Sequence, residues 1–325
     1  MKVLVTMTDK QKYSALCKEE KGISIFSKDW WLDAVCDEGN WNVILVEKGG
    51  QIVASMPYYL KRESMFTTIV MPKLTQTMEL YIKYPPEQKY YKKLSWEKEL
   101  ITSLIEQLPQ VDSFNQFFNY SITNWLPFYW NGFKQSTRYT YIIDPINREE
   151  LELFLETDGR RRRRRKAKRL GVTVIEGNDI KVFYELNKKT FQRQGLKIPY
   201  TFEYIDNLYN VCKKNNACKM FFAKDNKNEI IAANFLVYDS NTVYYLMGGI
   251  EPSKKDLGGM DVVQHESIKF AIENGKKFDF EGSMIESIEK YFRSFGAIQK
   301  PYFQIYKTNS KLWKVKKLLD RVLKK

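Results

Sequence analysis

Two carboxylates stand close together in the segment FDFEGS, residues 278–283. Asp279 and Glu281 alternate with Phe278 and Phe280, so on a strand both carboxylates would project from one face. Two carboxylates at a buried strand end can raise each other's pKa and then serve as a general acid or base. The alternative is a polar strand face that is hydrogen-bonded to neighbouring loops. We select Asp279 and Glu281 as the candidate catalytic residues.

A glycine-bearing loop precedes these carboxylates within residues 244–283, where the pattern predicts a strand, a loop, a helix and a second strand. Gly258 and Gly259 open the predicted helix, so its first backbone N–H groups point, without helical partners, at whatever anion lies in the loop. That arrangement binds a phosphate or an acyl carbonyl, although two glycines before a helix are often only a loop. The candidate substrate-binding residues in and around this region are Gly248, Gly249, Lys254, Lys255, Gly258, Gly259, Ser283 and Arg293.

Histidine and cysteine usage excludes several kinds of chemistry. The chain has one histidine, His265, and its four cysteines show no paired spacing typical of zinc or of a disulfide framework. A histidine-rich metal site is excluded, and we interpret His265 as an ordinary surface histidine. The N-terminal apolar run is too short for a signal peptide, and no segment approaches the ~20 apolar residues of a membrane span. We expect a cytoplasmic protein without a metal ion.

The net charge of +14 is concentrated in two segments. Nine of the ten residues in 160–169 are basic, and residues 311–325 hold seven basic residues and one acidic residue. The remainder of the chain is therefore close to neutral, so the basic character belongs to two defined places.

The first basic segment predicts an anionic partner. Arginine binds phosphate oxygens in pairs, so residues 160–165, with Arg162 and Arg165 as candidate ligands, would attract tRNA, a nucleotide diphosphate or an anionic membrane. A solvated helix is the alternative. If residues 160–170 are helical, Arg163, Ala167 and Leu170 share one narrow face, and that helix can lie on a surface but cannot be buried.

The second basic segment, residues 311–325, predicts an amphipathic helix. Its apolar residues fall within an arc of roughly 140° at helical spacing, and they are Leu312, Val315, Leu318, Leu319, Val322 and Leu323. Most of its basic residues cover the opposite side. This pattern is typical of a helix on an anionic membrane surface, and a terminal helix docked on the protein's own core is the equal alternative.

The elements that position these residues occur twice along the chain. The first half predicts a helix after Ser27, a hairpin turning at Gly49–Gly50, a helix over 97–108 and a strand over 139–143. The second half predicts a helix over 180–194, a hairpin over 219–239 and a final strand within 294–307.

This repeated order, in a chain of 325 residues, predicts two copies of one αβ domain. We place the first copy at residues 1–146, the second at 147–310 with a basic helix at 160–170, and a terminal helix at 311–325. The fold class is α/β (α+β), each copy a mixed twisted sheet flanked by helices, and the second copy is the active one.

The second half resembles the FemAB-like and BioF2-like family of double-GNAT acyltransferases. The resemblance rests on RRRRKAKRLGV at 162–172, TFQRQG at 190–195, YYLMGG at 244–249, FDFEGS at 278–283 and YFRSFGAIQKPYF at 291–303. It implies two tandem GNAT-like domains. It also implies transfer of an acyl or aminoacyl group to an amine of a cell-envelope lipid, polysaccharide or peptidoglycan precursor. The co-substrate would be acyl-CoA, acyl carrier protein or aminoacyl-tRNA, with no cofactor bound permanently.

Two functions follow as hypotheses. In the first, an amine attacks an activated ester or thioester, backbone N–H groups near Gly248 and Gly258 meet the developing oxyanion, and Asp279 or Glu281 deprotonates or orients the amine. Such an N-acyltransferase would work in the cytoplasm or at the inner face of the membrane. In the second, the chain is a non-catalytic protein that binds RNA or a membrane surface through its basic segments.

Overall fold

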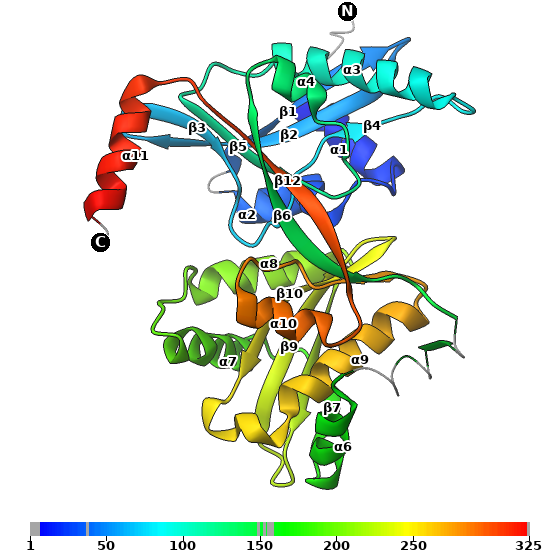
Figure 1. Ribbon diagram of the computed structural model, residues 1–325, viewed down its shortest axis with the longest axis vertical. Coiled ribbons are helices and arrows are strands. Elements are labelled where there is room, and N and C mark those ends of the chain that lie inside the picture. The colour runs from blue at the N-terminus through cyan, green and yellow to red at the C-terminus, as the bar shows by residue number, and fades with distance from the viewer. Residues whose placement is uncertain (1–6, 37–38, 148–149, 152–153, 155–158, 324–325) are drawn as a thin grey trace, which may run out of the picture. The chain divides into compact units, whose positions relative to one another are not determined.

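The computed structural model describes residues 7–36, 39–147, 150–151, 154 and 159–323. The chain divides into two compact units, unit 1 with Met1–Arg138 and Pro301–Lys325, and unit 2 with Tyr139–Lys300. Each unit has a mixed sheet flanked by helices (Figure 1), as the predicted α/β fold class requires. The domain boundaries predicted at 146/147 and 310/311 stay a prediction.

The sheet of unit 1 has the strand order β1-β2-β3-β5-β12, with β4 paired to β2. Its strands are β1 Trp41–Lys48, β2 Gln51–Glu63, β3 Phe66–Val70, β4 Tyr81–Ile82, β5 Ser113–Phe118 and β12 Ile298–Thr308. The β1–β2 turn forms at Gly49 and Gly50, whose φ angles of 57° and 76° are the pair that a tight right-twisted hairpin requires. The predicted hairpin is confirmed.

Helices cover the unit 1 sheet. They are α1 Asp9–Glu19, α2 Asp29–Val35, α3 Tyr90–Glu106, α4 Leu126–Trp130 and α11 Lys311–Leu323. The core forms where Leu100 and Leu104 of α3 pack with Phe114 and Phe118 of β5, all of them buried. The α3 helix begins at Tyr90, earlier than the predicted 97–108. The prediction missed its first turns because their side chains are mostly exposed and do not form a buried face.

The sheet of unit 2 has the strand order β6-β11-β10-β9-β8-β7. Its strands are β6 Lys134–Ile143, β7 Thr173–Glu176, β8 Cys218–Lys224, β9 Ile230–Tyr238, β10 Thr242–Ile250 and β11 Lys277–Asp279. Only the β10–β11 pairing is parallel among the strand pairings given for this unit. β8 and β9 form the antiparallel hairpin that was predicted over 219–239, and β7 pairs antiparallel with β8 after a connection through α7 and α8.

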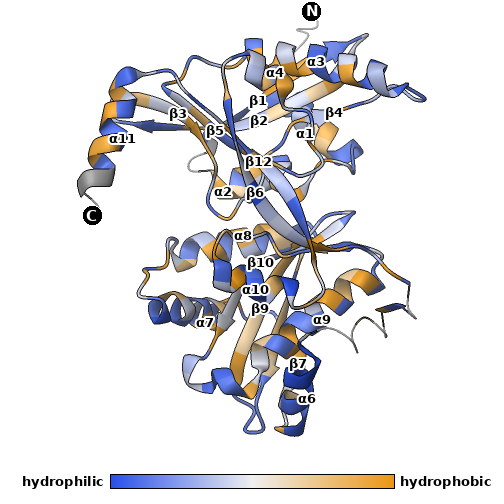
Figure 2. Ribbon diagram, in the orientation of Figure 1, coloured by the Kyte–Doolittle hydropathy of each residue, from blue (hydrophilic) through white to orange (hydrophobic). Residues whose placement is uncertain are grey.

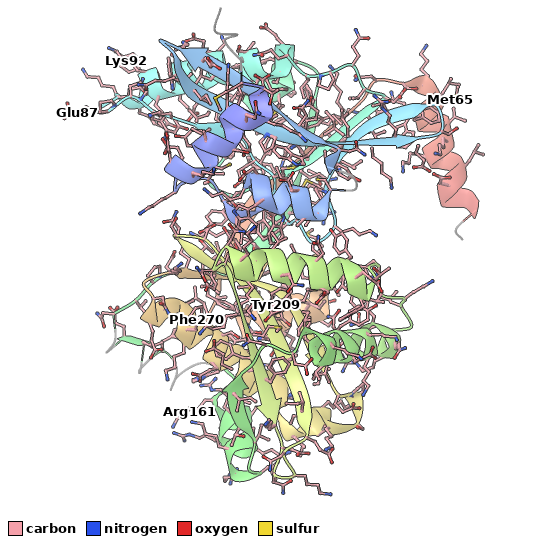
Figure 3. All side chains as sticks on the ribbon, turned by 180° about the vertical axis from the view of Figure 1, so that it is seen from behind. Met65, Glu87, Lys92, Arg161, Tyr209 and Phe270 are labelled. Carbon is pink, nitrogen blue, oxygen red and sulfur yellow. The ribbon has the colours of Figure 1, made fainter. Side chains whose placement is uncertain are left out.

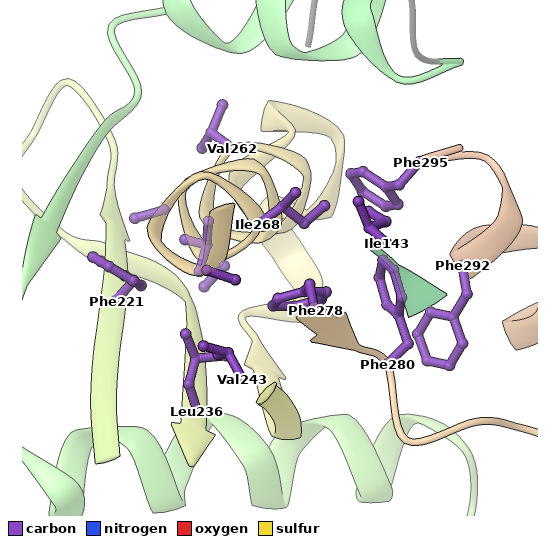
Figure 4. Close-up of a cluster of buried hydrophobic side chains, with 14 of the residues drawn as sticks. Ile143, Phe221, Leu236, Val243, Val262, Ile268, Phe278, Phe280, Phe292 and Phe295 are labelled. Atoms are coloured by element: carbon purple, nitrogen blue, oxygen red, sulfur yellow. The ribbon is translucent and has the colours of Figure 1, made fainter. Parts of the chain in front are cut away.

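Helices lie on both faces of the unit 2 sheet (Figure 1). They are α6 Arg161–Arg169, α7 Ile180–Arg193, α8 Phe202–Lys214, α9 Gly259–Glu273 and α10 Glu286–Arg293. Asp179 caps α7, since its side chain accepts a hydrogen bond from Val182 N–H. Figure 4 shows the core between α9 and the sheet, where Ile268 lies with Val243 and Phe278.

Two strands pass from one unit to the other. β6 starts in unit 1 and ends in unit 2, where Ile142 and Ile143 pair with β11. β12 starts in unit 2 and ends in unit 1, where residues 303–308 pair with β5. The last strand of each sequence copy therefore completes the sheet of the other copy's unit, which the linear order of the repeat does not reveal.

Candidate active site in unit 2

The strands β10 and β11 part at the position of the candidate carboxylates. They pair over only three residues, Thr242 to Tyr244 with Lys277 to Asp279, after which β11 ends and β10 continues to Ile250. A β-bulge between Tyr245 and Met247 falls just beyond this point. Bulges are over-represented next to active sites, because they change the direction of side chains and end regular pairing.

Helix α7 replaces β11 along the rest of β10. The Asn187 side-chain amide donates a hydrogen bond of 2.7 Å to the Gly248 carbonyl, and Ile250 N–H donates one of 3.1 Å to the Thr190 hydroxyl. Tyr200 in turn donates to the Asn187 side-chain carbonyl at 2.6 Å. These polar side chains satisfy the backbone that β11 leaves unpaired.

Asp279 is buried at the end of β11, with 1% of its surface exposed. Its Oδ1 accepts hydrogen bonds from the Thr140 hydroxyl of β6 and, at 2.8 Å, from Glu281 N–H. Its Oδ2 is buried and has no hydrogen-bond partner among the residues that the structure describes. Burial raises the pKa of Asp279 to about 6, against the opposing effect of these two hydrogen bonds.

Glu281 lies in a turn that directly follows β11, and not on the strand itself. The predicted strand through Glu281 is wrong, because β11 ends at Asp279 and Glu281 has a left-handed φ of 59°. Gly282 follows with a φ of 73°, and a Cβ there would lie 2.2 Å from the Tyr139 carbonyl oxygen, so only glycine fits. The Phe278 and Phe280 rings pack edge to face, with their centroids 4.9 Å apart.

The Glu281 carboxyl is easier to protonate than an exposed carboxyl. Burial, and then the charge of Asp279, raise the pKa of Glu281 well above its ordinary value. Its Oε1 is buried without a hydrogen-bond partner in the described part of the chain. Both carboxyls therefore hold a proton more readily than an exposed carboxyl does, a setting that suits proton transfer.

The glycines of the loop allow close packing. Gly258 caps α9 with a φ of 79°, and a Cβ there would lie 3.1 Å from Ala167 of α6. A Cβ at Gly259 would lie 2.9 Å from Ile231 of β9. Within the described residues, no side chain caps the first turn of α9. The expected role of Gly258 and Gly259 in binding an anion stays a prediction.

The other glycines lie on β10. Gly249 packs against α7. A Cβ added at Gly249 would lie 2.7 Å from the Cβ of Leu186. Gly248 faces the opposite side, where the Tyr245 hydroxyl would lie 2.0 Å from such a Cβ. A side chain at either position would therefore displace a neighbour.

The predicted cations are not gathered at one place. Lys254 forms ion pairs with Asp225 and Glu229, which raise its pKa and balance its charge. Arg293 pairs with Glu289 on α10 at 2.9 Å. Lys255, Arg162 and Arg165 are exposed, whereas the half-buried Ser283 accepts a hydrogen bond from Ile285 N–H.

A second polar cluster, at the first turn of α9, was missed from the sequence. Asp261, 4% exposed, pairs with Arg160 at 3.3 Å and with Arg163 at 3.8 Å. The Arg160 guanidinium lies over the Tyr291 ring at 4.4 Å and donates to Ser294 Oγ at 2.7 Å. The sequence signals for this cluster were the basic run that contains Arg160, an acidic residue after the two glycines and the motif that begins at Tyr291, but nothing in the sequence joined them.

The arginine run has an inner and an outer side. Arg164 and Ala167 are the buried residues of α6, whereas Leu170 is 40% exposed, so the inward face differs from the expected one of Arg163, Ala167 and Leu170. Figure 2 shows α6 as hydrophilic along most of its length, and Figure 3 shows Arg161 extending from it. The spacing of apolar residues could not predict that Arg164 would be the buried residue, because arginine is not counted as apolar.

Phe292 of α10 lies between the two strands where they part. Its ring is 4.7 Å from Phe280 and 6.1 Å from Tyr245 of β10, both measured between ring centroids. The Tyr291 hydroxyl beside it is buried with no hydrogen-bond partner among the described residues, and burial raises the pKa of Tyr291 well above its ordinary value. Aromatic side chains therefore border the carboxyl pair.

In the part of the chain that the structure describes, no group of three or more His, Cys, Asp or Glu side chains is arranged to hold a metal ion. None of the described helices is both long enough and apolar enough to cross a membrane.

Comparison with known proteins identifies a GNAT domain within unit 2. Residues 159–292 match the model described as an acetyltransferase (GNAT) domain. The crystal structure of FemX is similar with a TM-score of 0.65 and 15% identity, over 92% of this chain and 96% of that one. L-PGS from Bacillus licheniformis is similar with a TM-score of 0.56 and 12% identity, over 95% of each chain. The C-terminal domain (DUF2156) of a putative lysylphosphatidylglycerol synthetase from Agrobacterium fabrum has a TM-score of 0.51 and 9% identity, over 97% of this chain and 95% of that one.

No sequence among curated proteins matches this chain. The domain match and the shared fold nevertheless confirm the two predictions on which the rest depends, the tandem GNAT-like fold and the enzyme class. Residues 159–292 therefore form an acetyltransferase (GNAT) domain, and the chain as a whole shares the fold of the FemX crystal structure.

Proposed function

We propose that the enzyme transfers an acyl or aminoacyl group to an amine of a cell-envelope precursor, and that Asp279 is the base. The observation that carries this proposal is that two buried oxygens, Asp279 Oδ2 and Glu281 Oε1, have no hydrogen-bond partner among the described residues. Unsatisfied buried acceptors are costly in a purely structural role, so they favour a role in catalysis.

Proton transfer in the reaction would follow from the raised pKa values of the two carboxyls. With a pKa of about 6, Asp279 is mostly ionised at neutral pH and can take a proton from the amine as its nitrogen attacks the donor carbonyl. The new amide bond forms as the bond to the leaving thiolate or alkoxide breaks. Glu281, protonated, can donate to that leaving group and recover the proton from Asp279.

A backbone donor for the oxyanion lies on β10. Within a strand, the N–H and C=O of one residue point to the same side. Because the Gly248 carbonyl meets Asn187 on the side that β11 leaves open, Gly248 N–H points to that side as well. We assign Gly248 N–H to the developing oxyanion, with Gly258 and Gly259 as the second candidate pair.

Charged parts of the substrates would meet the exposed cations. Arg162, Arg165 and Lys255 lie at the surface and suit the phosphates of an acyl-CoA, an acyl carrier protein, a tRNA or a nucleotide diphosphate. Lys254 contributes less, because two carboxylates already balance its charge.

The acceptor we propose is an amine of an envelope lipid, polysaccharide or peptidoglycan precursor, met at the inner face of a membrane. One similar structure is described as a putative lysylphosphatidylglycerol synthetase, a name that joins an amino acid to a lipid headgroup. That similarity supports a lipid acceptor.

The test is amide formation by the full chain, followed by mass spectrometry. Each donor class would be combined with amine acceptors, and Asp279→Asn and Glu281→Gln would be compared with Glu266→Gln, a surface change on α9. We expect loss of roughly 10²-fold or more in turnover for Asp279→Asn and none for the control. Arg162→Gln with Lys255→Gln should raise KM for a phosphate-bearing donor and leave kcat unchanged.

Full turnover in the double variant of Asp279 and Glu281 would refute these roles. A different result would favour the second hypothesis, a non-catalytic binding protein. That result is RNA binding that depends on residues 160–165, combined with no turnover for any donor.

A further inference from the structure

The C-terminal helix α11 is held on unit 1 by one face. Trp313 is 6% exposed, and its ring lies 5.0 Å from the Phe66 ring of β3. Lys316 forms an ion pair of 3.0 Å with Glu63 of β2. Both contacts are made with the β2–β3 hairpin, so they set which side of α11 faces the protein.

The opposite side of α11 is apolar and open. Four of its aliphatic side chains are more than half exposed: Leu312 at 64%, Val315 at 53%, Leu318 at 60% and Leu319 at 57%. At ~100° per residue they span an arc of about 120°, whose centre lies about 160° from Trp313. The helix therefore docks through its tryptophan and leaves its aliphatic stripe uncovered.

The tip of the β2–β3 hairpin extends this surface. Met65 is 74% exposed, and Figure 3 shows it beside α11. The contact between its neighbour Phe66 and Trp313 keeps it there. We call the apolar patch the set Met65, Leu312, Val315, Leu318 and Leu319.

Lysines border the apolar patch. Lys311, Lys314 and Lys317 are exposed, and Lys61 and Arg62 are exposed at the end of β2. An uncovered apolar stripe with basic residues along its edges matches a surface of anionic phospholipid headgroups above acyl chains.

We propose that α11 and Met65 dock unit 1 on the surface of an anionic lipid bilayer. The apolar patch enters the boundary between headgroups and acyl chains, and the lysines contact lipid phosphates. Docking at a membrane gives access to a lipid-linked acceptor, and in this respect alone the inference rests on the proposed function.

Two other arrangements fit less well. The helix has 13 residues, or roughly 20 Å at ~1.5 Å per residue, which is short of the ~30 Å hydrocarbon core, so it lies on a bilayer and does not cross it. A second copy of the chain would bring the same lysines together across a two-fold contact, and like charges oppose that contact.

Vesicle sedimentation with the full chain tests the proposal. The probes are vesicles of phosphatidylcholine alone and of phosphatidylcholine with phosphatidylglycerol, each at low and high salt. We expect binding to the anionic vesicles that weakens with salt. Leu312→Gln with Leu319→Gln should weaken that binding by roughly tenfold or more.

The matched control is Leu196→Gln, which removes a leucine that is 53% exposed in unit 2 and should leave vesicle binding unchanged. Trp313 fluorescence reports whether α11 stays docked in each variant. Equal binding by the double variant, or equal binding to neutral and anionic vesicles, would overturn the proposal. So would a dimer in solution that the double variant abolishes, since a second copy would then cover the patch.

The outcome is separable from that of the proposed function. Transfer to a soluble amine needs no vesicle, so loss of vesicle binding with intact transfer would confirm a docking surface on an active enzyme. Vesicle binding without transfer for any donor would support the docking surface and refute the proposed function.

Discussion

Replacing Asp279 by Asn should make the protein more stable at neutral pH while it abolishes transfer. Burial raises the pKa of Asp279 from 3.8 to about 6, so the fold favours the protonated carboxyl. A shift of roughly two units corresponds to ~3 kcal/mol, which is the cost of holding the ionised form in the native state. Asn has the same shape without the charge, and its Oδ1 can still accept from Thr140 and from Glu281 N–H.

The pH dependence of this effect has a defined sign. Between pH 3.8 and about 6, the native protein keeps a proton on Asp279 that the unfolded chain has released. Stability of the wild type therefore falls as pH rises through this window, and the loss is complete above it. The Asn variant lacks this contribution, so the two proteins should differ little at low pH and most at neutral pH.

Urea unfolding over a pH series measures the difference. We expect the free energy of unfolding of Asp279→Asn to exceed that of the wild type by ~1–3 kcal/mol at neutral pH, since weaker hydrogen bonds to a neutral acceptor offset part of the gain. Transfer by the wild type should rise with pH through about 6, the pKa of Asp279, and transfer by the variant should be lost.

Glu281→Gln is the comparison for stability. Burial also raises the pKa of Glu281, so the same linkage predicts that this substitution raises the unfolding free energy at neutral pH and changes it little at low pH. Lower stability of Asp279→Asn at every pH, combined with full turnover, would show that Asp279 is a structural residue and would refute the reasoning.

Two further predictions concern stability in unit 2. Gly282→Ala places a Cβ 2.2 Å from the Tyr139 carbonyl oxygen at a left-handed φ, and should cost about 3 kcal/mol in thermal or urea unfolding; Gly275→Ala, equally left-handed but with nothing within 4 Å, should cost only ~1 kcal/mol. Equal losses in the two variants would contradict the close-contact argument. Arg160→Met removes a partner of the buried Asp261 carboxylate and should cost ~3 kcal/mol, and an Arg160→Met variant as stable as the wild type would show that the pair is not needed.

Much of the local structure could be predicted because its signals are local. The helix predicted at 180–194 is α7 Ile180–Arg193, since Asp179 caps it and its apolar spacing is helical. The β1–β2 turn follows from Gly49 and Gly50 in the same way. Two sheet-containing units follow from the repeat of these patterns.

The candidate site could be predicted only in its composition. Asp279 and Glu281 stood out as neighbouring carboxylates. We expected them on one face of a strand, whereas a turn after β11 brings them together. β11 pairs with β10 only as far as Asp279, Phe280 N–H still donates to the Tyr141 carbonyl of β6, and the turn at Gly282 then brings the chain close to Tyr139. Strand length depends on neighbouring strands, so no local pattern reveals it.

The hairpins, several helices, the uneven charge and the family resemblance could be inferred from the sequence alone, because all of these depend on residues close together along the chain. The tertiary fold sets which of those residues lie in contact with one another. It placed Arg160 against Asp261, exchanged the final strands β6 and β12 between the units, and turned Trp313 of α11 inward so that its leucines face outward. Burial and pairing between distant segments set these outcomes, because the cost of an unpaired charge or an exposed ring depends on what the fold brings beside it.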